Sequence, residues 1–269
     1  MRKMRRMLVL FLVAALLLPM MAAAEGMPAW EYPLAPEIIK DTGKYLTLAN
    51  RKNLLDSKYA PEDLVKITVN TTVDDPLRKD ANEALKAMFA AASADGYTLY
   101  VKSGYRSYQT QKTMYNNRLE NHHGKDDGLV AYPGASDHQT GLGVDILNYE
   151  WTKKDGMNKK FAETAEAQWM AAHCQEYGFI LRYMEDKEDV TGIKFEPWHF
   201  RYVGVKAAQY IMENHLSLEE FTEEWQTYLA DWEAAGGNFY QLLHDRARPN
   251  GVTVTGISDD GEEELSIYN

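Results

Sequence analysis

The fold of this chain is decided by the stretch Ser136-Asp137-His138-Gln139-Thr140-Gly141-Leu142-Gly143-Val144-Asp145-Ile146. It places the imidazole of His138 and the carboxylate of Asp145 seven residues apart, with two glycines between them that permit a sharp bend. Its apolar residues then alternate with Gly143 and Asp145, which predicts a short strand buried on one face. Asp145 would lie on the other face, towards the cleft that His138 also faces, so the pair is suited to a divalent metal.

A second stretch, Lys194-Phe195-Glu196-Pro197-Trp198-His199-Phe200-Arg201-Tyr202, adds the context that this spacing lacks. In a chain with 7 His, a His-x6-Asp pair arises by chance about as often as not, so the first motif alone is weak. Here Glu196 precedes His199 across Pro197, which disfavours helix and favours extended backbone. We therefore expect a strand edge or bulge that presents both side chains to one pocket. The expected metal ligands are His138, Asp145 and His199, with Glu196 as the base beside the metal's water.

Three motifs occur in the order typical of a known family: Ser-Gly-Tyr-Arg-Ser at 103–107, the 136–145 stretch, and Glu-Pro-Trp-His at 196–199. Over residues 45–215 the chain resembles the VanY-type zinc D-alanyl-D-alanine carboxypeptidases and the related bacterial L,D-carboxypeptidases of the same fold. Two departures are small. Asp137 stands where the family often has Glu, and Gly143 where it often has Ala.

The remaining candidate residues surround the expected metal site. Arg106 lies where a strand should meet a helix, a position that presents its guanidinium to a carboxylate or an oxyanion; a surface ion pair is the alternative. Gln111 falls on the first turns of that helix and would face the same pocket. Ser136 resembles a family residue that hydrogen-bonds the C-terminal end of the substrate, and turn capping is its alternative. Sequence does not separate the duties of Arg106 and the zinc towards the oxyanion and the terminal carboxylate.

The resemblance implies a zinc carboxypeptidase that removes C-terminal D-alanine from peptidoglycan stem peptides. Zinc lowers the pKa of bound water to about 7, and Glu196 would take the proton and pass it to the leaving amine. The alternatives are a D,D-dipeptidase or peptidoglycan endopeptidase on the same fold, or a non-catalytic wall-peptide or metal-binding module. Other hydrolase chemistries lack their motifs, because Ser-x-x-Lys, Gly-x-Ser-x-Gly and His-Glu-x-x-His are absent and one cysteine cannot form Cys-x-x-Cys.

Residues 1–24 have the pattern of a secretory signal: four basic residues, an apolar run and Ala22-Ala23-Ala24. We expect an exported protein, at the outer face of the cytoplasmic membrane, in the cell wall or secreted; the segment would hold it to a membrane only if uncleaved. Loss of those four charges changes the formal net charge of the 269-residue chain from −11 to −15. Such acidity excludes nucleic acid as a partner and favours small peptide substrates, with no cofactor beyond the metal.

The predicted fold class is α+β: a small antiparallel sheet carries the zinc site, helices pack over it, and a helical extension follows. The expected organisation is a loosely ordered leader (25–44), the carboxypeptidase domain (45–215), a helical extension (216–249) and an acidic, disordered tail (250–269). Cys174 is expected in the core, and His122 and His123 in an exposed loop. Helices are predicted from an Asp75-Pro76 start to Gly96, then at 108–120, 161–177, 205–214 and 217–236; strands at 97–102, 179–183 and 191–203.

Overall fold

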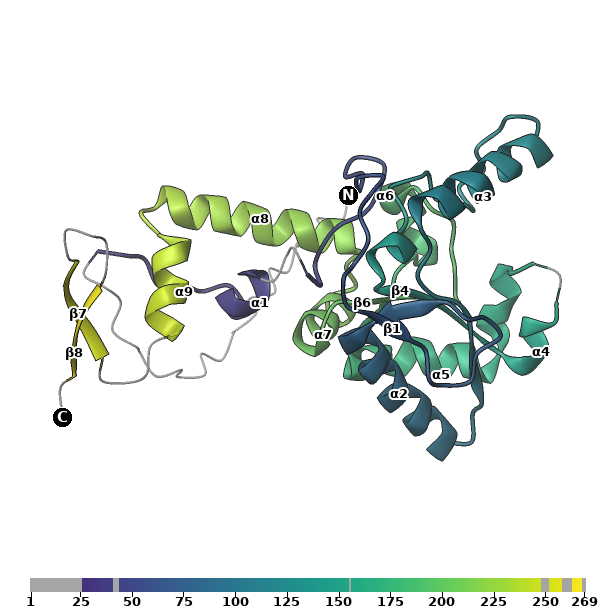
Figure 1. Cartoon of the computed structure of the whole chain (residues 1–269), viewed down its shortest axis with the longest axis horizontal. Coiled ribbons are helices and arrows are strands. Elements are labelled where there is room, and N and C mark those ends of the chain that lie inside the picture. Colours follow the sequence, from purple (N-terminus) through teal and green to yellow (C-terminus); the bar gives the residue numbers. More distant parts are fainter. Residues whose placement is uncertain (1–25, 41–43, 155, 248–251, 258–262, 268–269) are drawn as a thin grey trace, which may run out of the picture.

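The computed structural model describes residues 26–40, 44–154, 156–247, 252–257 and 263–267; the predicted signal segment lies outside these ranges. Its centre is a four-stranded antiparallel sheet with strand order β3-β4-β6-β5, and helices surround it (Figure 1). The predicted α+β fold is confirmed. The four strands are β3 (Leu99–Ser103), β4 (Gly143–Asn148), β5 (Phe179–Leu181) and β6 (His199–Tyr202).

Strand register brings the site residues together. In β4, Asp145 lies opposite His199 of β6 on one side and opposite Ser103 of β3 on the other. The β3–β4 ladder shifts register between Val101 and Ser103, so a bulge re-aims the end of β3 beside the site. The sheet therefore carries a ligand candidate on each of its two middle strands.

One face of the sheet is covered by α2 (Lys79–Ala94) and α5 (Ala165–His173), which lie on the same side in Figure 1. The apolar face of α2 is fully buried against the sheet, as at Leu85 and Met88, so the main core lies between these layers. The other helices of this part are α3 (Tyr108–Asn121), α4 (Tyr149–Thr152), α6 (Glu188–Thr191) and α7 (Val205–Glu213). The 3₁₀ turns are η2 (Asp137–Thr140), η3 (Lys159–Glu163), η4 (Cys174–Tyr177) and η5 (Glu185–Lys187).

A second core joins the leader to the helical extension. Tyr32, Leu34 and Ile39 are buried with residues of α7 and α8, and the indole N–H of Trp232 reaches the carbonyls of residues 28 and 29 at 3.1 Å. The expectation of a loosely ordered leader is therefore wrong for residues 26–40, because their aromatic and aliphatic side chains have a helix to pack against. The elements of this core are α1 (Pro36–Lys40), α8 (Leu218–Ala234) and α9 (Phe239–Ala247).

The predicted start of the first long helix is wrong. Residues Pro76–Arg78 form β2, which pairs antiparallel with β1 (Leu64–Lys66), and the helix begins at Lys79. Proline is tolerated as the first residue of a strand, and Leu77 is fully buried there. Asp75 accepts from the amide of Gly104 at 3.0 Å instead of capping the helix.

Two other elements are shorter than predicted. The strand expected over 191–203 is confined to β6, because α6 ends with Gly192 in the left-handed conformation and residues 192–198 are irregular before β6. The helix expected over 161–177 is divided at Thr164, whose extended backbone and hydroxyl cap α5. By contrast, the Ser107 cap of α3 and the Ser217 capping box of α8 are confirmed.

Within residues 252–257 and 263–267 the structure differs from the disordered tail that we expected. Strands β7 (Val252–Ile257) and β8 (Glu263–Ile267) pair antiparallel, in keeping with the β-branched residues that this segment contains.

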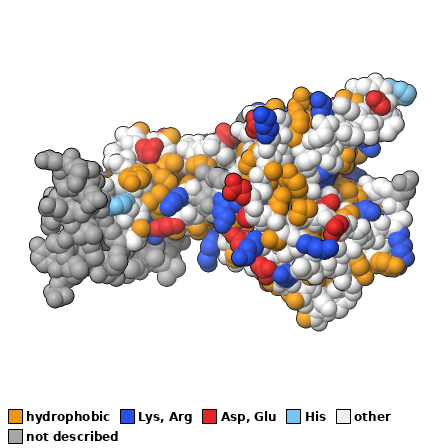
Figure 2. Space-filling model, in the orientation of Figure 1, with side chains coloured by type: hydrophobic (Ala, Val, Ile, Leu, Met, Phe, Trp, Pro, Cys, Tyr) orange, Lys and Arg blue, Asp and Glu red, His pale blue; other side chains and the backbone are white. Residues whose placement is uncertain are grey.

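Acidic and basic side chains are interspersed with apolar ones on the face of the molecule shown in Figure 2. Within the described ranges, no helix has both the length and the apolar character needed to cross a membrane.

Candidate metal centre and active-site cleft

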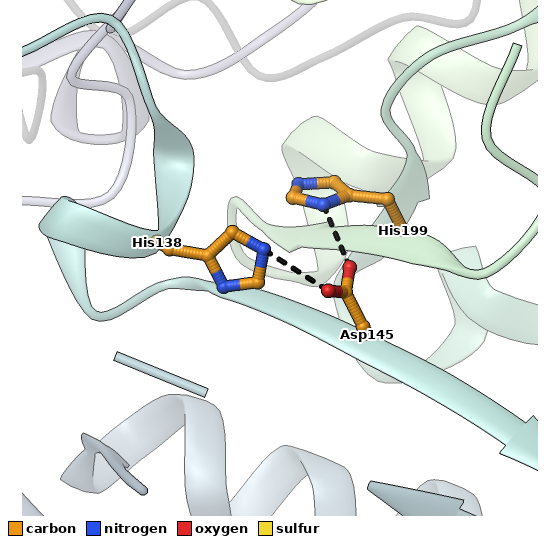
Figure 3. Close-up of side chains that lie close together, drawn as sticks. All are labelled: His138, Asp145 and His199. Atoms are coloured by element: carbon orange, nitrogen blue, oxygen red, sulfur yellow. Dashed lines mark hydrogen bonds and ion pairs between the residues drawn. The ribbon is translucent and has the colours of Figure 1, made fainter. Parts of the chain in front are cut away.

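The three predicted ligands converge at one buried point. His138 comes from η2, Asp145 from β4 and His199 from the first position of β6. Their ligand atoms lie within 4.8 Å of one another, and the carboxylate of Asp145 faces both rings (Figure 3). The distances from Asp145 are 3.3 Å to Nε2 of His138 and 3.0 Å to Nδ1 of His199.

Hydrogen bonds fix which nitrogen each histidine presents. Nδ1 of His138 lies 2.6 Å from the carbonyl oxygen of Gly104, so it donates there and leaves the lone pair of Nε2 towards Asp145. His199 presents Nδ1 to Asp145, while its Nε2 is buried and has no hydrogen-bond partner among the residues that the structure describes. Two imidazoles and one carboxylate that face one another are a donor set that suits Zn²⁺ with an open position.

The charge state of the site favours a cation. Burial opposes ionisation of Asp145, yet the imidazoles of His138 and His199 outweigh it and hold the pKa of Asp145 below its usual range. Burial and the nearby Arg106 lower the pKa of His138, against the opposing effect of Asp145, so its ring is favoured in the neutral form that binds metals. Asp145 therefore supplies a negative charge to the group, and His138 supplies a neutral nitrogen donor.

Glu196 lies beside this group in a turn rather than on a strand edge. The amide of His199 donates to the carbonyl of Glu196 at 3.1 Å, which closes the turn just before β6. An Oε2 atom of Glu196 lies 3.7 Å from Nδ1 of His199. Burial, with the charges of Asp145 and Asp137, raises the pKa of Glu196 well above its ordinary value, and Arg106 opposes this shift. A carboxyl with a raised pKa holds a proton more readily than an ordinary glutamate, which suits a general acid–base role.

Arg106 and Gln111 form one hydrogen-bonded unit at the same cleft. Nη1 of Arg106 donates to Oε1 of Gln111 at 2.9 Å, and Nη2 lies 3.8 Å from Oδ2 of Asp145. Gln111 in turn donates to the carbonyl of Ala131 at 2.6 Å. Ser136 is buried at the start of η2, and its hydroxyl makes no capping bond to that turn. The hydrogen bonds through Gln111 thus hold the guanidinium of Arg106 in place, facing Asp145.

All seven predicted site residues line one cleft of about 120 Å³. Apolar side chains form most of the rest of its wall. The lining residues besides the seven are Met114, Leu129, Val130, Ala131, Met157, Tyr183, Ile193 and Trp198. His122 and His123 follow α3 outside this lining, and Cys174 is fully buried in the main core, as expected.

Sequence reasoning missed the buried charges behind the ligands. Asp137 contacts Arg182 and Arg201, and all three side chains are at most 1% exposed. A signal existed: Arg182 follows the apolar run Phe179–Leu181, and Arg201 lies inside β6. A charged residue within an otherwise buried strand usually has a buried partner.

Known proteins resemble this chain over the same region. Residues 74–205 match the VanY family, described as D-alanyl-D-alanine carboxypeptidase. A protein named putative carboxypeptidase YodJ, from Bacillus subtilis (strain 168), is 42% identical over 196 residues that cover 70% of each chain. A D-alanyl-D-alanine carboxypeptidase of Enterococcus faecalis (strain ATCC 700802 / V583) is 34% identical over 186 residues, 65% of each chain.

Solved structures agree in sequence and fold. The LdcB LD-carboxypeptidase has 43% identity and a TM-score of 0.61, covering 65% of this chain and 84% of its own. A vancomycin-resistance D,D-pentapeptidase VanY, crystallised in complex with Zn(II), has 32% identity and a TM-score of 0.55, covering 66% and 98%. With its site residues in one cleft and these relatives over most of its sheet domain, this chain belongs to the VanY family of D-alanyl-D-alanine carboxypeptidases.

Proposed function

We propose that the protein is an exported, zinc-dependent carboxypeptidase that removes the C-terminal D-alanine from peptidoglycan stem peptides. The observation that carries the proposal is the buried convergence of His138, Asp145 and His199, with Glu196 and Arg106 in the same cleft. The zinc complex of a VanY relative supports the choice of metal.

The residues of the chain have separable duties in this proposal. His138, Asp145 and His199 hold the zinc, which when bound supplies a Lewis acid and lowers the pKa of a water molecule to about 7. Glu196 accepts the proton of the attacking water and returns it to the leaving amine. Arg106, oriented by Gln111, binds either the terminal carboxylate or the developing oxyanion. Ser136, which lines the same cleft, hydrogen-bonds the terminal residue of the substrate in this proposal.

The proposed substrate follows from the cleft and the relatives. A volume of about 120 Å³ beside a fixed guanidinium suits a small terminal residue that carries a carboxylate. Relatives named for D-alanyl-D-alanine and LD-carboxypeptidase activity support D-alanine as that residue. Export rests on the sequence of residues 1–24 and agrees with a substrate in the cell wall.

Incubation of the protein without residues 1–24 with pentapeptide and tetrapeptide stems tests the proposal. We expect mass spectrometry to detect free alanine from at least one stem, and the stem cleaved distinguishes D,D from L,D preference. A chelator should abolish release and added zinc should restore it. Release of an intact Ala-Ala dipeptide would replace the proposal with a dipeptidase. Binding of stems without cleavage, in a zinc-loaded protein, would support the non-catalytic module instead.

A further inference from the structure

Two acidic and two basic side chains form a buried cluster directly behind the metal group. This buried quartet consists of Asp137, Arg182, Arg201 and Glu219. Asp137, Arg182 and Arg201 are at most 1% exposed, and the side chain of Glu219 is 11% exposed. None of the four lines the cleft that holds the predicted catalytic residues. Their role is therefore to position neighbouring groups, not to contact a substrate.

The contacts of the quartet run from η2 to α8 without a gap. One carboxylate oxygen of Asp137 accepts from Nε of Arg182 at 2.8 Å, and the other accepts from Nη1 of Arg201. Arg182 then donates from both terminal nitrogens to the two oxygens of Glu219, each at 2.7 Å. Two carboxylates and two guanidiniums balance in charge, and the fork-to-fork pair on Glu219 fixes the orientation of Arg182.

The quartet connects the elements that carry the metal ligands. Asp137 immediately precedes His138 in η2, and Arg201 follows His199 by two residues in β6. The backbone amide of Arg182 also donates to the carbonyl of His199 at 3.2 Å. Buried ion pairs often add little to stability, because desolvation costs several kcal/mol per ion. The quartet instead fixes the position of η2 relative to β6.

Asp137 also lies near a buried nitrogen of a predicted ligand, Nε2 of His199. In the described part of the chain this nitrogen has no hydrogen-bond partner, and Oδ2 of Asp137 is 3.9 Å away. Histidines that bind metals through one nitrogen almost always donate the other N–H to a carboxylate, a carbonyl or water. A shift of about 0.7 Å towards His199 would bring Oδ2 of Asp137, now 3.9 Å away, within hydrogen-bond range of Nε2.

We propose that Glu219 is a positioning residue for the metal centre: through Arg182 it holds Asp137 as the outer partner of His199. This inference rests on the zinc site of the proposed function. It extends the site to α8, which lies beyond residues 74–205 that match the family. The helical extension is then a part of the support of the active site as well as a neighbour of the leader.

Zinc affinity, measured by competition with a chromophoric chelator, tests the inference. Glu219→Gln keeps size but loses the charge that pairs with Arg182, and we expect zinc to bind about tenfold more weakly. Glu223→Gln is the matched control. Glu223 lies one turn further along α8, is exposed, and lines a surface groove that Glu219 also lines. It should bind zinc like the wild type. The KM for a stem peptide should be unchanged in both variants, because the quartet does not line the cleft.

Melting of the metal-free proteins separates positioning from general support. A merely structural Glu219 would lower the melting temperature and leave the zinc affinity of the folded protein unchanged, which would overturn the inference. We expect the double variant Glu219→Gln with Asp137→Asn to bind zinc no more weakly than Asp137→Asn alone. The reason is that Glu219 acts on His199 only through Arg182 and Asp137. A wild type that does not bind zinc would overturn the proposed function as well, whereas equal affinities in all variants would overturn this inference alone.

Discussion

Arg106 is oriented before any substrate arrives. Its guanidinium donates to Gln111 and, at 3.3 Å, to the hydroxyl of Ser103, and Gln111 is itself held by the carbonyl of Ala131. A fork fixed on two sides loses little further entropy when it binds a planar carboxylate or a developing oxyanion. The residue is therefore matched to its proposed duty by geometry as well as by charge.

Arg106→Lys should consequently be a damaging change. Lysine keeps the charge but lacks the planar fork, so we expect kcat/KM for stem cleavage to fall by about 10²-fold or more. Arg118→Lys is the control on α3, since Arg118 pairs with Asp127 and does not line the cleft. Unchanged kinetics in Arg106→Lys would return Arg106 to the role of a structural ion pair.

The two departures from the family pattern are in contact. A Cβ atom at Gly143 would lie 2.9 Å from the carbonyl carbon of Asp137 and 3.0 Å from its Cβ. The absent side chain at Gly143 therefore lets η2 approach β4, and the shorter Asp137 can reach Arg182 and Arg201 from there.

Gly143→Ala should push η2 away from β4 and weaken zinc binding, by about tenfold, because Asp137 and His138 move with it. Addition of Asp137→Glu lengthens the carboxylate and should recover part of that loss. Zinc affinity of the single and the double variant is the measurement. A single variant that binds zinc like the wild type, or a double variant no better than the single, would contradict this account.

Residue identities within short motifs were predictable, and their distant partners were not. His138 and Asp145 share one stretch, and Glu196 and His199 share another, so local sequence was enough to nominate them. Arg182 and Arg201 reach Asp137 across 45 and 64 residues. A charged residue in a buried strand indicates that a partner exists, but sequence spacing does not identify it.

Among the elements, those with local signals were predicted best. The caps of α3 and α8 are set by residues three apart, and both helices begin where the sequence predicts. The start of α2 depends on β1, because Pro76–Arg78 become a strand only when they pair with Leu64–Lys66. Pairing with a segment ten or more residues away outweighed the local Asp-Pro signal for a helix.

The turn η4 offers a test of the main core through its single cysteine. Burial raises the pKa of Cys174 from an ordinary 9.0 to about 12, so near pH 8 the reactive thiolate is almost absent in the folded protein. We expect iodoacetamide to label the native protein at least about 10²-fold more slowly than the urea-unfolded protein. Mass spectrometry of the intact chain measures the two labelling rates. Similar rates in the native and the unfolded protein would show that η4 does not hold Cys174 in the core.

At the scale of the whole molecule, the described residues contain a sheet domain and a second core, which residues 26–40 share with the helical extension. The hydroxyl of Tyr32 donates to Glu224 at 2.9 Å across 192 residues, and the ring of Trp30 packs edge-on against Trp232. Composition predicted a leader and a helical extension, but it could not predict that they pack on each other. The Arg182–Glu219 pair then links this second core to the metal centre.

The central claim is that the cleft is a metal-dependent carboxypeptidase site in which Glu196 moves the proton. Zinc content and alanine release, measured together on Glu196→Gln and His199→Ala, test it most directly. Glu196→Gln should keep its zinc and lose nearly all turnover, because the amide cannot accept the proton. His199→Ala should lose both zinc and turnover. A Glu196→Gln protein that is fully active, or one that is metal-free, would contradict the account.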